Sequence, residues 1–245
     1  MFDILITIAK KDFNKTSFLM ESILKNVKYF EEIYCVSDKE VPKKFKIDGV
    51  NYFTDDEVID FDFSKIDMEY RRGWYRQQFI KLFQEITQDN YLVIDGDIFI
   101  NKPIEISSDT PYFFIGMDQY HLPYFHFLKD VMSLDKVYPR SFICEMMFFK
   151  RNIIRHILEK MNVDKYQFFD ICTDGINKIN NASGFSEYEM YGNYVTKNFP
   201  DFYGYKDIKV LHQHRKREWE DEEIKKHINK YIGSEYDIFT MHSWI

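Results

Sequence analysis

The sequence contains little cysteine: only Cys35, Cys144 and Cys172 occur among 245 residues, and they lie far apart. The odd number and the absence of a C-x-x-C pair argue against a disulfide framework or a cysteine-ligated zinc site. We therefore expect reduced thiols, as in a cytosolic protein. Glycine and proline are also scarce, at nine and six residues. Because no linker rich in either residue divides the chain, we expect one domain over residues 1–245.

The chain also lacks a basic excess and a long apolar run. Its formal net charge is −7, which argues against general nucleic-acid binding, because that function needs a basic surface. The apolar run at the start is too short for a secretory signal or a membrane span, and no later run approaches the length of a span. We therefore expect a cytoplasmic protein without a transmembrane segment.

Aromatic residues, in contrast, make up 18% of the chain, mainly phenylalanine and tyrosine. Tyrosine combines a flat apolar face with a polar tip, which suits sugar and nucleotide surfaces as well as a core. One short run, HQHRKREW from His212 to Trp219, is basic. It fits a solvated surface, a diphosphate site or contact with anionic lipid, so a peripheral position at the inner membrane face stays open.

Apolar periodicity predicts alternating strands and helices through the first hundred residues. Predicted strands cover Phe2–Ala9, Ile33–Val36, Val50–Phe53 and Tyr91–Ile94, with helices after the first strand and over Trp74–Ile86. This order implies parallel strands with crossover helices. After Pro103 we expect strands at Tyr112–Met117 and Val210–His212, an apolar run at Phe142–Phe149, and helices near 153–161 and at Asp221–Tyr231. The predicted fold class is α/β: a central, mostly parallel sheet flanked by helices, with a mixed C-terminal half.

The stretch YLVIDGDIF places two carboxylates, Asp95 and Asp97, at the end of a predicted strand. Asp-Gly between apolar runs also predicts a β-hairpin, but the helix just before it favours a parallel strand. Residues two apart on an extended strand share a face, so we expect both carboxylates to project together. Such a pair suits Mg²⁺ or Mn²⁺ with open positions for phosphate oxygens. Gly96 between them would let a ligand approach the backbone closely.

An apolar strand that ends in D-x-D after a β-α-β start resembles the glycosyltransferases of the GT-A fold, which use nucleotide-sugar donors. Three blocks are similar to a bacterial group of uncharacterised GT-A-like proteins, and SFICEMMFFKR (Ser141–Arg151) agrees with them. The blocks are GWYRQQFIKLF (Gly73–Phe83), YLVIDGDIFI (Tyr91–Ile100) and FSEYEMYGNYV (Phe185–Val195). The resemblance implies a single GT-A (Rossmann-like) domain. It implies nucleotide-sugar binding in about residues 1–103, and acceptor binding in about residues 104–245, which include a C-terminal tail.

The resemblance also implies roles for individual residues. Asp97 would bind the Mn²⁺ or Mg²⁺ ion that bridges the donor diphosphate, and Asp95 would contact the metal or the ribose. His242, in the terminal MHSWI, is preferred over His212 and His214 as the histidine that completes the metal site. The other implied donor-binding residues are Thr7, Ala9, Lys10 and Asp38 near the ends of the first two strands, Arg76 and Gln77 on the helix, and Gly96.

A second acidic pair, Glu187 and Glu189, flanks Tyr188 in SEYEMYG. Ser186 and Glu189 fit a capping box at a helix start. This leaves Glu187 as the candidate general base that takes a proton from the acceptor hydroxyl. Tyr188 and Glu189 are candidates for contacting the acceptor or the sugar. Asp174, in CTDGIN, competes with Glu187 as the base, although an Asp-Gly turn is the favoured interpretation there.

Glu145 interrupts the apolar run ICEMMFF. A buried carboxylate without a partner is costly. Glu145 is therefore either part of an ion pair or a residue that hydrogen-bonds sugar hydroxyls of the donor or acceptor.

Together these features predict a metal-dependent, hexosyltransferase-like glycosyltransferase. It would move a sugar from a nucleoside-diphosphate sugar, with UDP as the expected nucleotide, to a hydroxyl of a glycan or lipid-linked glycan. A bacterial setting suggests surface polysaccharide synthesis, such as that of a capsule. One alternative is a nucleotidyltransferase acting on sugar phosphates, but ITIAKKDFNK lacks the glycine-rich phosphate loop expected there. Another is a non-catalytic nucleotide- or glycan-binding module. Inversion and retention both stay open.

Overall fold

The computed structural model describes all residues except 117, 119, 180–182, 213–218 and 244–245. The strands are β1 (Phe2–Ile8), β2 (Phe30–Ser37), β3 (Val50–Thr54), β4 (Asn90–Asp95), β5 (Ile98–Ile100), β6 (Tyr112–Ile115), β7 (Met146–Lys150), β8 (Gly204–Asp207), β9 (Val210–Leu211) and β10 (Ile238–Thr240). The α-helices are α1 (Thr16–Asn26), α2 (Asp55–Val58), α3 (Arg72–Phe83), α4 (Leu122–Met132), α5 (Arg151–Met161), α6 (Lys165–Ile179), α7 (Glu187–Asn198) and α8 (Asp221–Tyr231). Short 3-10 helices are η1 (Lys10–Lys15), η2 (Lys43–Phe45), η3 (Phe63–Lys65) and η4 (Glu69–Arg71).

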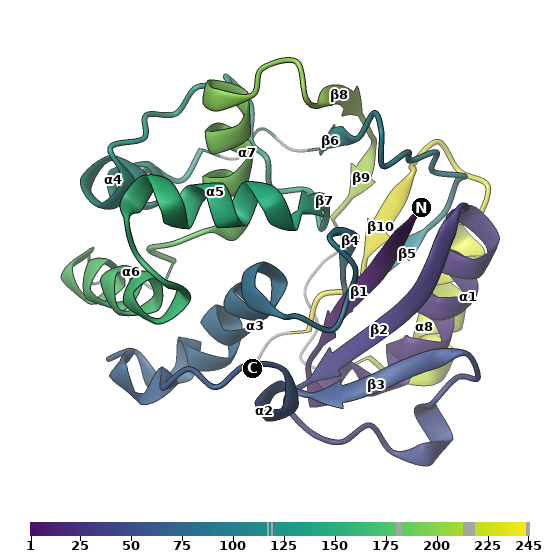
Figure 1. Cartoon of the computed structure of the whole chain (residues 1–245). Coiled ribbons are helices and arrows are strands. Elements are labelled where there is room, and N and C mark those ends of the chain that lie inside the picture. The colour runs from purple at the N-terminus through teal and green to yellow at the C-terminus, as the bar shows by residue number, and fades with distance from the viewer. Residues whose placement is uncertain (117, 119, 180–182, 213–218, 244–245) are drawn as a thin grey trace.

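The main sheet has the strand order β3-β2-β1-β4-β7. The pairs β1–β2, β1–β4 and β2–β3 are parallel, and β7 runs antiparallel to β4. Figure 1 shows α1 and α8 on one side of this sheet and α3, α5 and α7 on the other. Cover on both faces explains why all seven residues of β1 are buried. The predicted α/β class, with a central, mostly parallel sheet flanked by helices, is confirmed.

The D-x-D stretch connects two different sheets. Strand β4 ends at Asp95, the chain turns at residues 96 and 97, and β5 then joins a second sheet of order β5-β10-β9. There β5 pairs antiparallel with β10, and the Met241 amide donates to the Asp97 carbonyl oxygen at 2.7 Å. The hairpin interpretation of IDGDIF is therefore wrong, and the parallel placement of β4 is confirmed.

Gly96 lies where strand β1 approaches the turn. Its amide donates to the Thr7 carbonyl oxygen at 3.0 Å. A Cβ at this position would lie 2.7 Å from that oxygen and 2.8 Å from the Ile8 side chain. We expected the missing side chain to make room for a ligand. The space is instead occupied by the Thr7 carbonyl group and the Ile8 side chain of β1.

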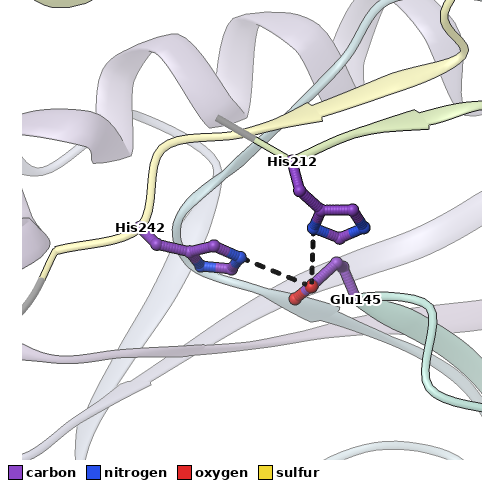
Figure 2. Close-up of side chains that lie close together, drawn as sticks. All are labelled: Glu145, His212 and His242. Carbon is purple, nitrogen blue, oxygen red and sulfur yellow. Dashed lines mark ion pairs between the residues drawn. The ribbon is translucent and has the colours of Figure 1, made fainter. Parts of the chain in front are cut away.

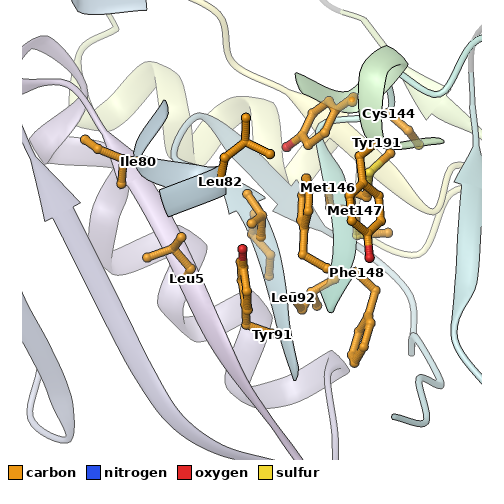
Figure 3. Packing of buried hydrophobic residues seen from close by; sticks show 14 of the residues in the cluster. Leu5, Ile80, Leu82, Tyr91, Leu92, Cys144, Met146, Met147, Phe148 and Tyr191 are labelled. Carbon is orange, nitrogen blue, oxygen red and sulfur yellow. The ribbon is translucent and has the colours of Figure 1, made fainter. Parts of the chain in front are cut away.

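The core is built on the main sheet and the helices that cover it. In Figure 3, Leu5 of β1, Leu92 of β4 and Phe148 of β7 lie below Leu82 of α3 and Tyr191 of α7. A smaller buried cluster joins β5 and β10 to α8; it consists of Phe99, Trp219, Ile224, Ile228, Phe239 and Met241. The three cysteines are buried and form no disulfide, and burial raises the pKa of Cys35 to about 12.

Two further predictions have clear outcomes. The helix expected at Asp221–Tyr231 matches α8. The Asp-Gly turn expected at Asp174 is wrong, because both residues lie inside α6. A Cβ on Gly175 would lie 2.8 Å from the Phe127 ring, so this glycine lets α6 pack closely on α4. No helix in the described parts of the chain is both long enough and apolar enough to cross a membrane.

Candidate functional site

The polar side chains of interest gather where the order of the main sheet reverses. From β1 the chain steps outward to β2 and β3, whereas β4 lies on the opposite side of β1. In open α/β sheets, ligands bind beyond the carboxyl ends of the strands at such a point. Thr7 of β1 and Asp95 of β4 are register partners there. The Lys10 amide donates to Asp38 Oδ1 at 2.7 Å and so joins the ends of β1 and β2.

A pocket of about 490 Å³ lies beside these strand ends. Its walls carry four lysines and one glutamate, with two phenylalanine rings between them. This combination suits a ligand with a flat apolar part and negative charge. The lining residues are Lys10, Lys11, Phe13, Asn14, Lys39, Glu40, Pro42, Lys44 and Phe45.

Asp97 and His242 form the first contact of the site. His242 Nδ1 lies 2.9 Å from Asp97 Oδ2. Burial alone would lower the pKa of His242, but the hydrogen bond and the charge of Asp97 raise that pKa to about 9. Burial would likewise raise the pKa of Asp97, and the contact with His242 lowers it to about 2. The histidine that we preferred at the sequence level therefore lies beside the D-x-D turn, and His214 lies outside the described residues.

The segment that carries His242 is held by a buried lysine. Lys15 is fully buried, and its ammonium group donates to the Met241 carbonyl oxygen and, at 2.7 Å, to Ser243 Oγ. Asp12 balances the charge through an ion pair with the same ammonium group. Lys11 Nζ also donates to the Ser243 carbonyl oxygen at 2.8 Å, so the segment is held on both sides of His242. The segment around His242 therefore lies against η1, which carries Asp12 and Lys15.

Asp95 contacts a different set of side chains. Lys81 Nζ lies 2.7 Å from Asp95 Oδ1 and 2.7 Å from Glu187 Oε1. The Tyr188 hydroxyl donates to the same Asp95 oxygen at 3.2 Å. Burial alone would lower the pKa of Lys81, but the two carboxylates raise it above its ordinary value. Asp95 and Asp97, which we expected to project together, meet different cationic partners: Lys81 lies beside Asp95 and His242 lies beside Asp97. The charges of both aspartates nevertheless act on Glu145 and His242.

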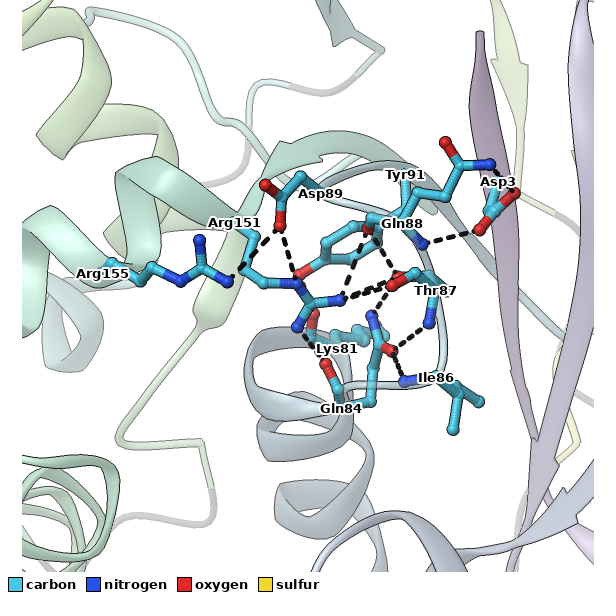
Figure 4. Close-up of polar contacts among 10 residues, drawn as sticks. All are labelled: Asp3, Lys81, Gln84, Ile86, Thr87, Gln88, Asp89, Tyr91, Arg151 and Arg155. Carbon is cyan, nitrogen blue, oxygen red and sulfur yellow. Dashed lines mark hydrogen bonds and ion pairs between the residues drawn. The ribbon is translucent and has the colours of Figure 1, made fainter.

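Lys81 is placed by a polar network at the end of α3, shown in Figure 4. The Tyr91 hydroxyl donates to the Lys81 carbonyl oxygen at 2.8 Å. Arg151, which is buried, donates to the carbonyl oxygens of Gln84 and, at 3.1 Å, of Thr87. These bonds satisfy carbonyls at the helix end and fix the loop into β4, so Lys81 and Asp95 keep a defined relative position.

Glu145 reaches the same site from the start of β7. Its Oε1 lies 3.6 Å from His242 Nε2 and 3.9 Å from His212 Nδ1 (Figure 2). Burial, followed by the charge of Asp95, raises the pKa of Glu145 to about 8. Of the two interpretations left open, the ion-pair geometry is present; a sugar contact is untested. Carboxylate oxygens and imidazole nitrogens at this separation fit a divalent cation.

The remaining predicted site residues are placed as follows. Glu187 is 3% exposed and pairs with Lys81 at 2.7 Å. Glu189 accepts from the Ser141 hydroxyl at 2.6 Å and from the Phe142 amide at 3.1 Å.

Among the predicted donor-binding residues, Arg76 lies 3.2 Å from Asp56 and 3.8 Å from Asp55. Ala9, ahead of η1, and Gln77 on α3 are partly exposed, and Thr7 is buried.

Lys81, which pairs with Asp95 and Glu187, was not among the residues that we predicted for the site. A signal was available: Lys81 is a single charge inside the apolar run FIKLF. A charge at such a position is buried unless the helix turns it to solvent, and a buried lysine requires a carboxylate. The next strand along the chain, β4, ends on such a carboxylate, Asp95.

Comparison with known proteins gives the following findings. Residues 5–122 match the model of a family of unknown function, DUF6492. No curated protein sequence matches the chain. Among solved structures, mouse xyloside xylosyltransferase 1 in its apo form has a TM-score of 0.48 at 11% identity, over 98% of this chain and 97% of that one.

Two structures of LgtC are also similar. The active-site mutant Q189E has a TM-score of 0.49 at 8% identity, over 86% of this chain and 75% of that one. The galactosyltransferase LgtC in complex with donor and acceptor sugar analogues has a TM-score of 0.49 at 7% identity, over 97% of this chain and 86% of that one.

Proposed function

We propose that this chain is a glycosyltransferase of the GT-A type, which moves a sugar from a nucleoside-diphosphate sugar to a hydroxyl of a glycan acceptor. The observation that carries the proposal is the D-x-D turn at the reversal point of the sheet, with His242 on Asp97 at 2.9 Å. Carboxylates and imidazoles gathered beyond the strand ends form a site for a metal-bound diphosphate. Surface polysaccharide synthesis is the proposed context.

In this proposal the donor lies along the ends of β1 and β2. The nucleotide, proposed to be UDP, occupies the 490 Å³ pocket, with its base against Phe13 and Phe45. Lys10 and Lys11 attract the diphosphate. Asp38, whose Oδ1 accepts from the Lys10 amide, is the proposed ribose-binding residue. A divalent ion such as Mn²⁺, when bound near Asp97 and His242, would neutralise the charge that builds on the leaving diphosphate.

The fate of the acceptor proton depends on Glu187. An inverting transfer needs a general base that reaches the acceptor hydroxyl, and Glu187 is 3% exposed and paired with Lys81. A retaining transfer needs no dedicated base, so the burial of Glu187 favours retention in our proposal. Glu187 then positions Lys81 and Asp95, while Tyr188 borders the sugar. Glu189 supports the segment at Ser141.

The proposal is tested by calorimetry with UDP, GDP and CDP, each with and without Mn²⁺, followed by hydrolysis assays with a panel of nucleotide sugars. We expect one nucleoside diphosphate to bind in a metal-dependent manner. Asp97→Asn should abolish this binding, while Asp174→Asn, an exposed carboxylate on α6, serves as the matched control. Absence of nucleotide binding in the presence of metal would sink the proposal. Nucleotide binding without turnover of any donor would favour a non-catalytic module.

A further inference from the structure

Three side chains from distant parts of the sequence converge beside the D-x-D turn. Glu145 precedes β7, His212 follows β9, and His242 follows β10. One ligand atom from each lies within 4.8 Å of the others. Figure 2 shows both imidazoles directed at the same Glu145 oxygen, at 3.9 Å from His212 and 3.6 Å from His242. Ligand atoms about 2.0–2.2 Å from one ion lie roughly 3–4 Å from each other, so an ion fits between them with little movement.

We propose that Glu145, His212 and His242 are the ligands of a divalent transition-metal ion, and that Asp97 orients His242 instead of binding the ion directly. The two nitrogens of His242 face different groups: Nδ1 lies 2.9 Å from Asp97 Oδ2, and Nε2 faces Glu145. Metal-bound histidines commonly donate their second ring N–H to a carboxylate, which fixes the tautomer. Asp97 therefore keeps the proton on Nδ1 and leaves the Nε2 lone pair for the metal.

Asp95 is unsuited to be a ligand in this arrangement. Its Oδ1 is held by Lys81 at 2.7 Å and by the Tyr188 hydroxyl at 3.2 Å. The ammonium group also places a positive charge next to any ion that would bind Asp95. The two aspartates of D-x-D thus have separate tasks, although their spacing alone suggests a shared ion.

The backbone at Glu145 gives an independent indication of function. Glu145 has φ +60, a left-handed conformation that is uncommon for a residue other than glycine. Its carbonyl oxygen accepts from the Asp95 amide at 2.9 Å, which ties this conformation to the end of β4. Such conformations cluster at functional sites, where the surrounding structure imposes them. Here the effect is to aim a buried carboxylate at the two histidines.

Two imidazoles and one carboxylate predict the kind of metal. Such a set suits Zn²⁺, Co²⁺ or Mn²⁺ and leaves positions open for substrate oxygens. Mg²⁺ prefers oxygen ligands alone and should bind more weakly. The inference concerns metal binding by the chain itself, so it can hold or fail whether or not the protein transfers sugars.

The test is calorimetric titration of the metal-stripped chain with Zn²⁺, Mn²⁺ and Mg²⁺, together with the visible absorption of the Co²⁺ form. We expect one transition-metal ion per chain. His212→Gln should weaken its binding about 10-fold or more and change the Co²⁺ spectrum, and Glu145→Gln should weaken binding similarly. Asp95→Asn should change the affinity less than about 3-fold. His126→Gln, an exposed histidine on α4, is the matched control and should leave binding unchanged.

The opposite pattern overturns the proposal. Loss of binding in Asp95→Asn with normal binding in His212→Gln would place the ion between the D-x-D carboxylates. Absence of any transition-metal binding, or Mg²⁺ binding as tight as that of Zn²⁺, would also overturn it. His212 is partly exposed, so its variant should fold even if replacement of the buried Glu145 does not.

Discussion

Replacing Lys81 by methionine is the sharpest test of the buried charges beside Asp95. The substitution keeps much of the side-chain volume and removes the ammonium group that lies 2.7 Å from both Asp95 and Glu187. The side chain of Glu187 is 5% exposed and that of Asp95 is 23% exposed. The buried charge of Glu187 therefore loses its cationic partner, whereas Asp95 keeps some contact with water.

The expected loss is about 3–5 kcal/mol in the free energy of unfolding at pH 8, the usual effect of leaving a buried charge unpaired. That is a large part of the 5–15 kcal/mol typical of a domain. Burial already raises the pKa of Glu187 above its ordinary value, and Lys81 opposes the rise. Without Lys81 this pKa rises further. A carboxyl group whose pKa is raised in the folded state lowers the free energy of unfolding as the pH rises. The loss of stability in Lys81→Met should therefore be smaller at pH 5 than at pH 8.

Urea denaturation of both proteins at pH 5 and pH 8 measures the effect. Lys65→Met is the matched control, because Lys65 pairs with Asp170 on the surface at 2.6 Å, and its loss should barely move the midpoint. Adding Glu187→Gln to Lys81→Met should recover part of the loss at pH 8. A Lys81→Met variant within about 1 kcal/mol of the wild type at pH 8, or an equal defect at both pH values, would refute the reasoning.

Three further predictions follow from single contacts. Burial raises the pKa of Asp55 from 3.8 to about 6. The shift lowers the free energy of unfolding by up to about 3 kcal/mol as the pH rises through this range. Asp55→Asn should therefore stabilise the protein against urea at pH 8 and not at pH 3.5. Gly96→Ala should cost about 1–3 kcal/mol in thermal melts, because its Cβ would lie 2.7 Å from the Thr7 oxygen. Gly73→Ala in α3 is the control, since apart from its own helix backbone and chain neighbours its Cβ would meet nothing within 4 Å, and it should be neutral or stabilising. Lys15→Met should weaken Zn²⁺ binding about 10-fold or more by releasing the segment around His242, and unchanged affinity in calorimetry would contradict that anchoring role.

Much of the fold could be predicted because the parallel half has strong local signals. The buried run of β1, the helical spacing before β4 and the D-x-D at its end each show in the sequence. The bounds of α8 also agree with its charged, periodic pattern. These elements depend on local periodicity, which one sequence reveals directly.

The parts that were missed depend on tertiary pairing. Glu145 joins the site because β7 runs antiparallel to β4, so the residue before β7 lies at the same edge as the residue that ends β4. The sequence singles out Glu145 as a candidate, but its position beside His242 follows only from this antiparallel pairing. Similarly, the second sheet unites β5, β10 and β9 across more than a hundred residues. We expected Arg76 to bind the donor, but its guanidinium group pairs with Asp56 at 3.2 Å.

The burial of Lys15 also provides a chemical reporter. An ammonium group without exposure that donates to Met241 and Ser243 is inaccessible to amine-reactive reagents, whereas the neighbouring Lys10 and Lys11 are exposed. Acylation of Lys15 requires the segment around His242 to lift away first. Lys25, an exposed residue of α1 outside the site, provides the reference. The ratio of Lys15 to Lys25 labelling, followed over time by mass spectrometry, would therefore measure how often the site opens, and a ligand that closes the site would slow the Lys15 reaction but not the Lys25 reaction.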